Sequence, residues 1–368
     1  MNPGPPGGAK PGSSSKTHTE KGQNLQASSG NYAAFALICG PILGERMRAK
    51  SAALFSLALA LFGVAAVASG QTSEPWPQND PEKLAAGPAK ETILYGRKLF
   101  NETYSVIGPE VRDTSMRYSG NNLSCQNCHL QGGTQKFALP MVGVYSVFPQ
   151  YMGRENEVRT IEERIQGCME RSMNGRELPL GGKEMKALVA YIQLQSTGIP
   201  VGKATEGRGS PNLPLLARAA DPKRGAAVYM DKCSFCHQEN GQGQRKGAPG
   251  EAAGYVYPPL WGPDSFNDGA GMHRVIASAS FIRANMPFGT HYDKPELSVE
   301  DAWDVAAYIN SQPRPHRDHL DADYPNRARK PVDAPFPPYT DKFPSEQHKY
   351  GPFQPLLDAQ NVSAQAPR

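Results

Sequence analysis

Cys-Gln-Asn-Cys-His occupies residues 125–129 of this 368-residue chain, and Cys-Ser-Phe-Cys-His occupies residues 233–237. Two thiols at this spacing can each form a thioether with one vinyl group of a haem, and the histidine that follows then lies beneath the iron. One such motif alone would also suit zinc binding or thiol redox chemistry. Two copies, behind an N-terminal export signal, favour two covalently bound c-type haems. The predicted attachment residues are Cys125, Cys128, Cys233 and Cys236, and the predicted proximal iron ligands are His129 and His237.

The surroundings of the two motifs repeat as well. Short helices are predicted before them, at residues 93–100 and around residues 223–229. An amphipathic helix with an Ala-Tyr-Ile core follows each motif, at residues 190–192 and 307–309. We therefore expect a mostly α-helical protein of two tandem cytochrome c domains, each built around a covalently bound haem. The expected boundaries are residues 71–199 for the first domain, 200–220 for a Gly/Pro/Ser-rich linker and 221–312 for the second domain.

The last section, residues 313–368, contains eleven prolines, which argues against helix. It also holds more aromatic residues than is typical of a disordered tail. These aromatics are Tyr324, Phe336, Tyr339, Phe343, Tyr350 and Phe353. We expect an extended Pro-rich strap packed over the domains, and the alternative is a disordered tail. Its histidines, His316, His319 and His348, are expected to be surface or packing residues.

The N-terminal 70 residues look like a leader rather than a folded domain. Residues 1–31 have the composition of a disordered segment, a basic stretch follows at residues 46–50, and an apolar run extends over residues 52–68. Small residues after that run are typical of a signal-peptide cleavage site, and Met47 is a natural start. The alternative is an uncleaved single-span anchor. We expect export to the periplasm, with no stable membrane contact if the signal is cleaved.

Charge and hydropathy exclude two classes of protein. The mean hydropathy of −0.53 argues against a polytopic membrane protein. The net charge of +4 is too small and too dispersed for a nucleic-acid binder. Residues 1–70 hold six basic and two acidic residues, so the remaining chain has 33 of each sign. Positive charge for an anionic ligand must therefore be gathered locally.

The second axial ligands decide what each haem can do. For the second haem, Met286, followed by Pro287, lies at a spacing from His237 that is typical of a thioether ligand; Met272, His273 and His291 are the rivals. For the first haem, the candidates are Met141, Met152, Cys168, Met169 and Met173.

Cys168 differs from the other candidates because it is the one thiol left once the leader and its Cys39 are removed and four thiols hold haem. A thiolate bound to ferric iron lowers the reduction potential. The alternative is a buried, inert cysteine.

The segment around Cys168 has the pattern of a short helix over residues 161–173. Thr160 and Glu163 form a capping box, and Asn174-Gly175 supplies a stop. Arg164, Cys168 and Ser172 recur on one face, and Gly167 permits close approach of a flat cofactor. Together with Arg154 from the preceding loop, these side chains are predicted to line an oxyanion-binding pocket. The alternative is that the arginines pair with Glu162, Glu163 or the haem propionates.

The sequence resembles the dihaem thiosulfate dehydrogenases, the tetrathionate-forming family, over residues 88–353. Apart from the two haem motifs, the resemblance rests on blocks at residues 132–134, 148–154, 167–175, 258–262, 265–272, 285–287 and 348–353. The block around Cys168 is the most specific of them.

The resemblance implies a role for each site residue. His129 and Cys168 would ligate the active-site haem, and His237 and Met286 the electron-transfer haem. Arg154, Arg164 and Ser172 would hold the sulfonate oxygens of the substrate. Some members carry a lysine that can bind iron immediately before this methionine; here the residue is Asn285, so we expect plain His/Met ligation.

The implied reaction is the oxidative coupling of two thiosulfates to tetrathionate, in a direction that the sequence does not fix. Electrons would pass from the His/Cys-ligated haem to the His/Met-ligated haem and on to a soluble cytochrome or similar acceptor. Two alternatives stay open: a non-catalytic dihaem electron carrier, and a haem enzyme that transfers thiosulfate to a carrier protein.

Overall fold

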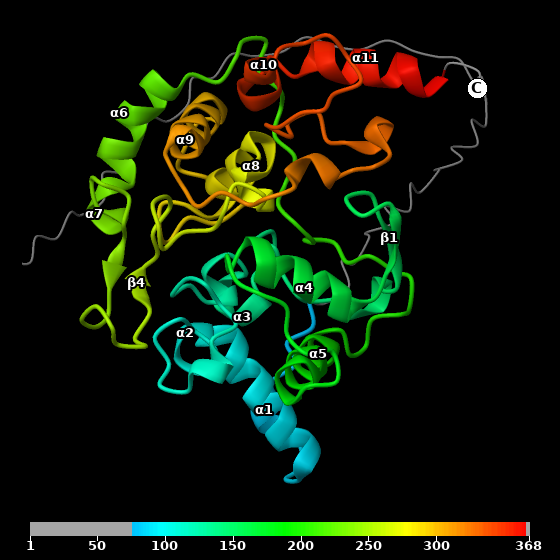
Figure 1. The fold of residues 1–368 in the computed structure, drawn as a ribbon, viewed down its shortest axis with the longest axis vertical. Helices are drawn as coiled ribbons and strands as arrows, with labels where there is room; N and C mark the ends of the chain where they lie inside the picture. The colour runs from blue at the N-terminus through cyan, green and yellow to red at the C-terminus, as the bar shows by residue number, and fades with distance from the viewer. Residues whose placement is uncertain (1–75, 366–368) are drawn as a thin grey trace, which may run out of the picture. The chain divides into compact units, whose positions relative to one another are not determined.

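The computed structural model describes residues 76–365, with side chains to residue 361. The predicted signal peptide and Cys39 lie outside these residues. Helices dominate, and the strands form two small antiparallel pairs (Figure 1). One pair is β1 (Gln150–Met152) with β2 (Glu157–Arg159), in which Tyr151 lies opposite Val158. The other is β3 (Gln244–Arg245) with β4 (Tyr255–Tyr257). The predicted mostly α-helical class is confirmed.

The first repeat is built around α1 (Pro88–Asn101) packed on α5 (Lys183–Gln195). The two helices touch at Gly96, where a Cβ atom would lie 1.9 Å from the carbonyl oxygen of Ala187, so only glycine allows this approach. Between them come α2 (Thr103–Val106), α3 (Leu130–Gly133) and α4 (Ile161–Arg171). Apolar residues of α1, α4 and α5 share one buried core.

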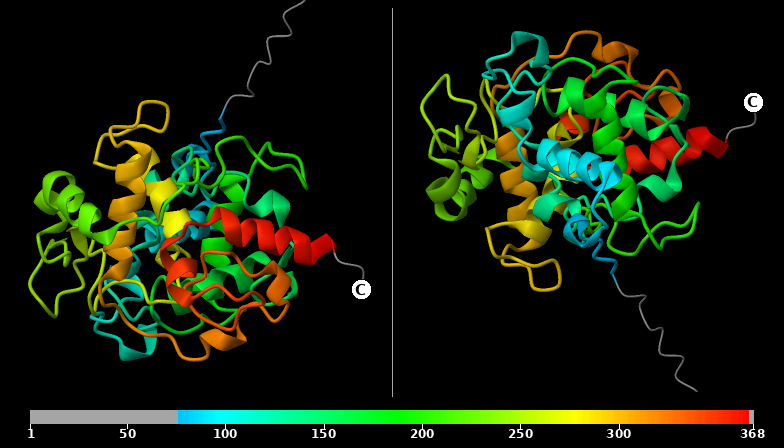
Figure 2. Two further views of the ribbon diagram at one scale, coloured as in Figure 1. Left: turned by 90° about the horizontal axis from the view of Figure 1, so that it is seen from above. Right: turned by 90° about the horizontal axis from the view of Figure 1, so that it is seen from below.

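The second repeat uses the same device. Its α6 (Pro222–Lys232) packs on α9 (Val299–Ser311), and a Cβ atom at Gly225 would lie 1.9 Å from the carbonyl oxygen of Asp304. The helices α7 (Ser234–His237) and α8 (Val275–Asn285) lie between them in the chain. Figures 1 and 2 show both pairs, α1 beside α5 and α6 beside α9. The internal repeat seen in the sequence is therefore a repeat of helix crossings.

Seven short 3-10 helices complete the elements of the described chain. They are η1 (Pro81–Lys83), η2 (Thr114–Met116), η3 (Cys125–Asn127), η4 (Tyr145–Val147), η5 (Gly271–His273), η6 (Leu320–Ala322) and η7 (Arg327–Arg329). Within residues 76–365, no helix has the length and apolar character needed to cross a membrane.

The expectation that residues 313–368 form only an extended strap is wrong. The segment contains α10 (Ser345–Tyr350) and α11 (Gln354–Gln365). Eight of its eleven prolines precede Ser345, and Pro355 is the second residue of α11, where the helix requires no N–H donor. The proline count was informative, but the position of each proline decided where helix could form.

A polar interface joins the two haem-motif repeats. Asn267, which is 2% exposed, donates its amide to the carbonyl oxygen of Glu170 at the end of α4 (2.8 Å) and to the side chain of Asn174 (3.0 Å). Asn121 of the first repeat donates to the carbonyl oxygen of Ser265 (3.1 Å). Asn121 also donates to the carbonyl oxygen of Ser172, the residue that follows α4 (2.9 Å), so asparagine side chains from both repeats fix the end of the helix that bears Cys168.

We predict that Asn267→Ala lowers the free energy of unfolding by about 1–3 kcal/mol, because it leaves a buried carbonyl group without its donor. Denaturant titration followed by circular dichroism measures this change. Asn240→Ala, at an exposed asparagine that bonds only within its own loop, is the control and should change stability by less than about 0.5 kcal/mol. Equal effects of the two substitutions would contradict the role given to Asn267.

Candidate functional site

Both Cys-X-X-Cys-His histidines are oriented in the same way by the backbone. His129 donates through Nδ1 to the carbonyl oxygen of Leu139, and His237 donates through Nδ1 to the carbonyl oxygen of Pro258 (2.8 Å). This hydrogen bond places the proton on Nδ1 and leaves the lone pair of Nε2 free in each ring, which is the arrangement found in metal-ligating histidines. Burial lowers the pKa of His129 to about 4, so its imidazole is neutral, as iron ligation requires. The histidines therefore fit the proximal position of a c-type haem.

Cys168 lies near the first motif, on the helix that the sequence predicted. The capping box of Thr160 and Glu163 begins α4, and Ser172 caps its end. Cys168 interacts electrostatically with Cys125 and Cys128, so α4 brings its thiol to the first haem motif. Met169 and Met173, two rival ligands, are instead buried in the hydrophobic core.

Arg164 contacts Cys168 directly. Its Nη1 donates to the sulfur over 3.1 Å, and the Cys168 charge raises the pKa of the guanidinium. Arg164 is also close enough to His129 to lower the pKa of that imidazole, after the larger effect of burial. In the part of the chain that the structure describes, Arg164 makes no ion pair with a carboxylate, which leaves donors for a ligand. The predicted alternative of pairing with Glu162 or Glu163 does not occur for this arginine.

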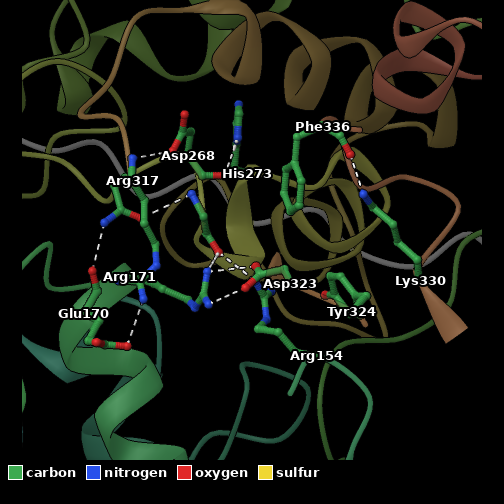
Figure 3. A network of polar contacts seen from close by, with 12 residues as sticks. Arg154, Glu170, Arg171, Asp268, His273, Arg317, Asp323, Tyr324, Lys330 and Phe336 are labelled. Carbon is green, nitrogen blue, oxygen red and sulfur yellow. Dashed lines mark hydrogen bonds and ion pairs between the residues drawn. The ribbon is translucent and has the colours of Figure 1, made fainter. Parts of the chain in front are cut away.

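Arg154 is held by an acidic residue that sequence reasoning missed. Its Nη1 donates to Asp323 (2.6 Å) and to the carbonyl oxygen of Gly269 (3.1 Å). Asp323 also accepts two hydrogen bonds from Arg171, at 2.9 and 2.7 Å, and Figure 3 shows both arginines converging on this carboxylate. Asp323 lies far from both arginines in the chain, so no local spacing could have indicated it. Arg171 lay within the block around Cys168, but its neighbours gave no reason to single it out.

A cavity of about 400 Å³ brings the predicted pocket residues together. Arg154, Arg164 and Ser172 all line it, beside Gly167 of α4. The lining includes six arginines and two glutamates: Arg154, Arg159, Arg164, Arg171, Arg274 and Arg329, with Glu155 and Glu163. Tyr324, Arg329 and Pro331 come from the C-terminal segment, which the sequence had not connected with the site. Such a cationic hollow suits a small multivalent anion.

Met286, the predicted thioether ligand, belongs to the same hydrophobic cluster as Cys233 of the second haem motif. Met286 follows the last residue of α8 and packs, together with Cys233, against the hydrophobic core of the second repeat. Among the rivals, His273 donates to the carbonyl oxygen of Asp268 (2.8 Å), and His291 bonds to Asp293 at the surface (2.6 Å).

Asn285 stands where some members of the resembled family carry a lysine, and here its side chain makes hydrogen bonds between the two repeats. Its buried amide donates to the carbonyl oxygen of Phe137 (3.1 Å) and accepts from Gln135 (2.9 Å), both of the first repeat. The position before Met286 is therefore used for contact between the repeats.

We predict that Asp323→Asn lowers the free energy of unfolding by about 3 kcal/mol, because it removes the negative charge that compensates two largely buried guanidinium groups. Asp321→Asn, two residues earlier at an exposed position, is the matched control and should be nearly neutral. Denaturant titration of both variants measures this change. Equal unfolding midpoints for the two variants would show that the Asp323 ion pairs contribute nothing to stability.

Comparisons with known proteins agree with this picture. The family model described as the SoxA/TsdA cytochrome c domain matches residues 115–201, and the cytochrome c model matches residues 222–313. The chain therefore contains two cytochrome c domains in tandem and two covalently bound haems c.

Curated relatives share much of the chain. A thiosulfate dehydrogenase of Stutzerimonas stutzeri is 39% identical over 237 residues, which cover 64% of this chain and 72% of the relative. One from Allochromatium vinosum is 40% identical, over 63% of this chain and 82% of the relative. Among solved structures, the thiosulfate dehydrogenase TsdBA of Marichromatium purpuratum matches with a TM-score of 0.59 and 40% identity, over 66% of this chain and half of that longer one.

Proposed function

Since the chain belongs to the thiosulfate dehydrogenase family, we propose that it couples two thiosulfates oxidatively to tetrathionate in the cavity beside Cys168, and that the coupling can also run in reverse. The observation that carries this proposal is the meeting of Arg154, Arg164 and Ser172 in one arginine-rich cavity on the face of α4 that bears Cys168. These residues supply oxyanion donors next to Cys168, the one cysteine of the described residues that lies outside the haem motifs.

Electrostatic repulsion is the main obstacle to this reaction. Two dianions 5 Å apart repel by roughly 13 kcal/mol at an effective dielectric constant of about 20. Guanidinium groups offset this repulsion and bind sulfonate oxygens through paired N–H donors. Because Arg154 and Arg274 are held by their own carboxylate partners, this part of the cavity wall needs little rearrangement when the anions enter.

Cys168 is proposed to act both as an iron ligand, with His129, and as a sulfur nucleophile. When bound, the two haems supply two one-electron acceptors for the electron pair that the coupling releases. The Cys168 thiolate and the outer sulfur of the first thiosulfate form one S–S bond and release two electrons. The outer sulfur of the second thiosulfate then attacks that bond, which forms tetrathionate and restores the thiolate. Arg164, 3.1 Å from the sulfur, stabilises the thiolate at the start and at the end.

The second domain is the proposed exit for electrons, with His237 and Met286 as iron ligands. A thioether ligand raises the potential, which favours onward transfer to a soluble cytochrome or a similar acceptor. Phe235, inside the second motif, is 89% exposed, and Phe288, two residues after Met286, is 87% exposed, which supports access of a partner to this end. The basic and apolar pattern of residues 46–68 supports a periplasmic location.

We predict that Cys168→Ala keeps both haems but loses nearly all thiosulfate oxidation. The assay is steady-state turnover in both directions, with thiosulfate plus an oxidant and then with tetrathionate plus a reductant. The haem content of the variant, measured by absorbance, is the internal control. Full activity in Cys168→Ala would overturn the proposed role of the thiol, and a wild-type protein inactive in both directions would favour the electron-carrier alternative.

Arg164→Ala is predicted to raise the KM for thiosulfate at least tenfold, because it removes a guanidinium group that makes no ion pair with a carboxylate of the described chain. Arg154→Ala should also raise it, since Arg154 lines the same cavity. The control is Arg112→Ala, at an exposed arginine outside the cavity. An unchanged KM together with a shifted haem potential would instead indicate that these arginines pair with haem propionates.

A further inference from the structure

The cavity arginines divide into two groups by their partners. Four have a carboxylate partner: Arg154 and Arg171 pair with Asp323, Arg159 with Glu157, and Arg274 with Asp333. The other two, Arg164 and Arg329, make no ion pair with a carboxylate of the described chain. Arg164 is already assigned to the neighbourhood of Cys168. Arg329 is therefore a cavity-lining cation with no assigned role.

The guanidinium of Arg329 has free N–H donors, and the backbone on either side of this residue is held in place. Its guanidinium lies 5.1 Å from the centre of the Tyr151 ring and donates no hydrogen bond to residues 76–361. Its five N–H groups are therefore available to a ligand. Gln360 of α11 donates to the carbonyl oxygens of Ala328 (3.1 Å) and Lys330 (2.8 Å), the residues on either side of Arg329. These two hydrogen bonds fix the backbone around Arg329, whose side chain lines the cavity.

Arg329 also comes from a different part of the chain than the predicted sulfonate site. Arg164 and Ser172 belong to α4, whereas Arg329 ends η7, and its Cβ lies 3.8 Å from the position that a Cβ of Gly153 would occupy. The cavity of about 400 Å³ is far larger than the ~10–15 Å³ that a single water-sized sphere requires on the same measure, so it has room for more than one small anion. A second anion can therefore bind there with separate donors.

Resting on the proposed function, we propose that Arg329 binds the sulfonate of the second thiosulfate, which becomes the distal sulfonate of tetrathionate. The first thiosulfate is held by Arg154, Arg164 and Ser172 near Cys168. The second brings its own two negative charges and needs a cation that is not already neutralised. Arg329 meets that need, and its planar fork can bind two sulfonate oxygens at once. It binds and orients the anion and takes no part in bond formation.

The test compares Arg329→Ala and Arg329→Lys with wild type in thiosulfate oxidation with an artificial electron acceptor. We expect Arg329→Ala to raise the half-saturating thiosulfate concentration about tenfold, with kcat within about twofold. Inhibition by added tetrathionate should weaken to a similar extent. Arg329→Lys, which keeps the charge but loses the fork, should lie between the two.

Arg176→Ala is the matched control, because Arg176 also lies over a tyrosine ring, that of Tyr118 at 4.0 Å, but outside the cavity. It should leave both constants unchanged. Unchanged constants in Arg329→Ala, with an active wild type, would overturn this proposal and leave the proposed function intact. A shifted potential of the first haem without a change in saturation would also overturn it, by assigning Arg329 to a propionate. An inactive wild type would overturn the proposed function itself.

Discussion

The carboxylate of Asp323 is the contact on which the candidate site depends. It is 7% exposed and accepts hydrogen bonds from Arg154, in the loop before α4, and from Arg171, on α4 itself. Both arginines also donate to the carbonyl oxygen of Gly269, from the second domain. The two ion pairs of Asp323, with the hydrogen bonds to Gly269, therefore hold together the Cys168 helix, the second cytochrome domain and the C-terminal segment. Because a buried charge is tolerated only with its partner, all three must be in place together.

The same principle explains how a nearly neutral protein can handle multivalent anions. Residues 71–368 carry 33 basic and 33 acidic residues, so no overall field attracts the substrate. Acidic partners behind the cavity wall, Asp323 and Asp333, fix Arg154, Arg171 and Arg274. Arg164 and Arg329 remain available at the surface of the cavity. Positive potential is concentrated where two dianions must meet, and the fixed arginines give it a constant geometry.

Local patterns in the sequence predicted much of this, and distant contacts account for the rest. Residues a few positions apart determine the haem motifs, the repeated helices and the capping box of α4. All three could therefore be predicted from the sequence. Asp323 and Arg329 reach the site from the far end of the chain, in a segment where proline content pointed away from helix. The helices α10 and α11 were missed for the same reason, although Gln360 of α11 supports Arg329. Tertiary ion pairs leave no periodic signal, so only the fold could reveal them.

In the proposed mechanism, Cys168 binds the iron of the first haem beside the arginine-rich cavity. Low-temperature electron paramagnetic resonance of the oxidised protein tests it most directly. We expect a low-spin signal of a thiolate-ligated haem beside a His/Met signal, with the thiolate signal lost in Cys168→Ala. Two His/Met signals in the wild-type protein, or an unchanged spectrum in the variant, would contradict it.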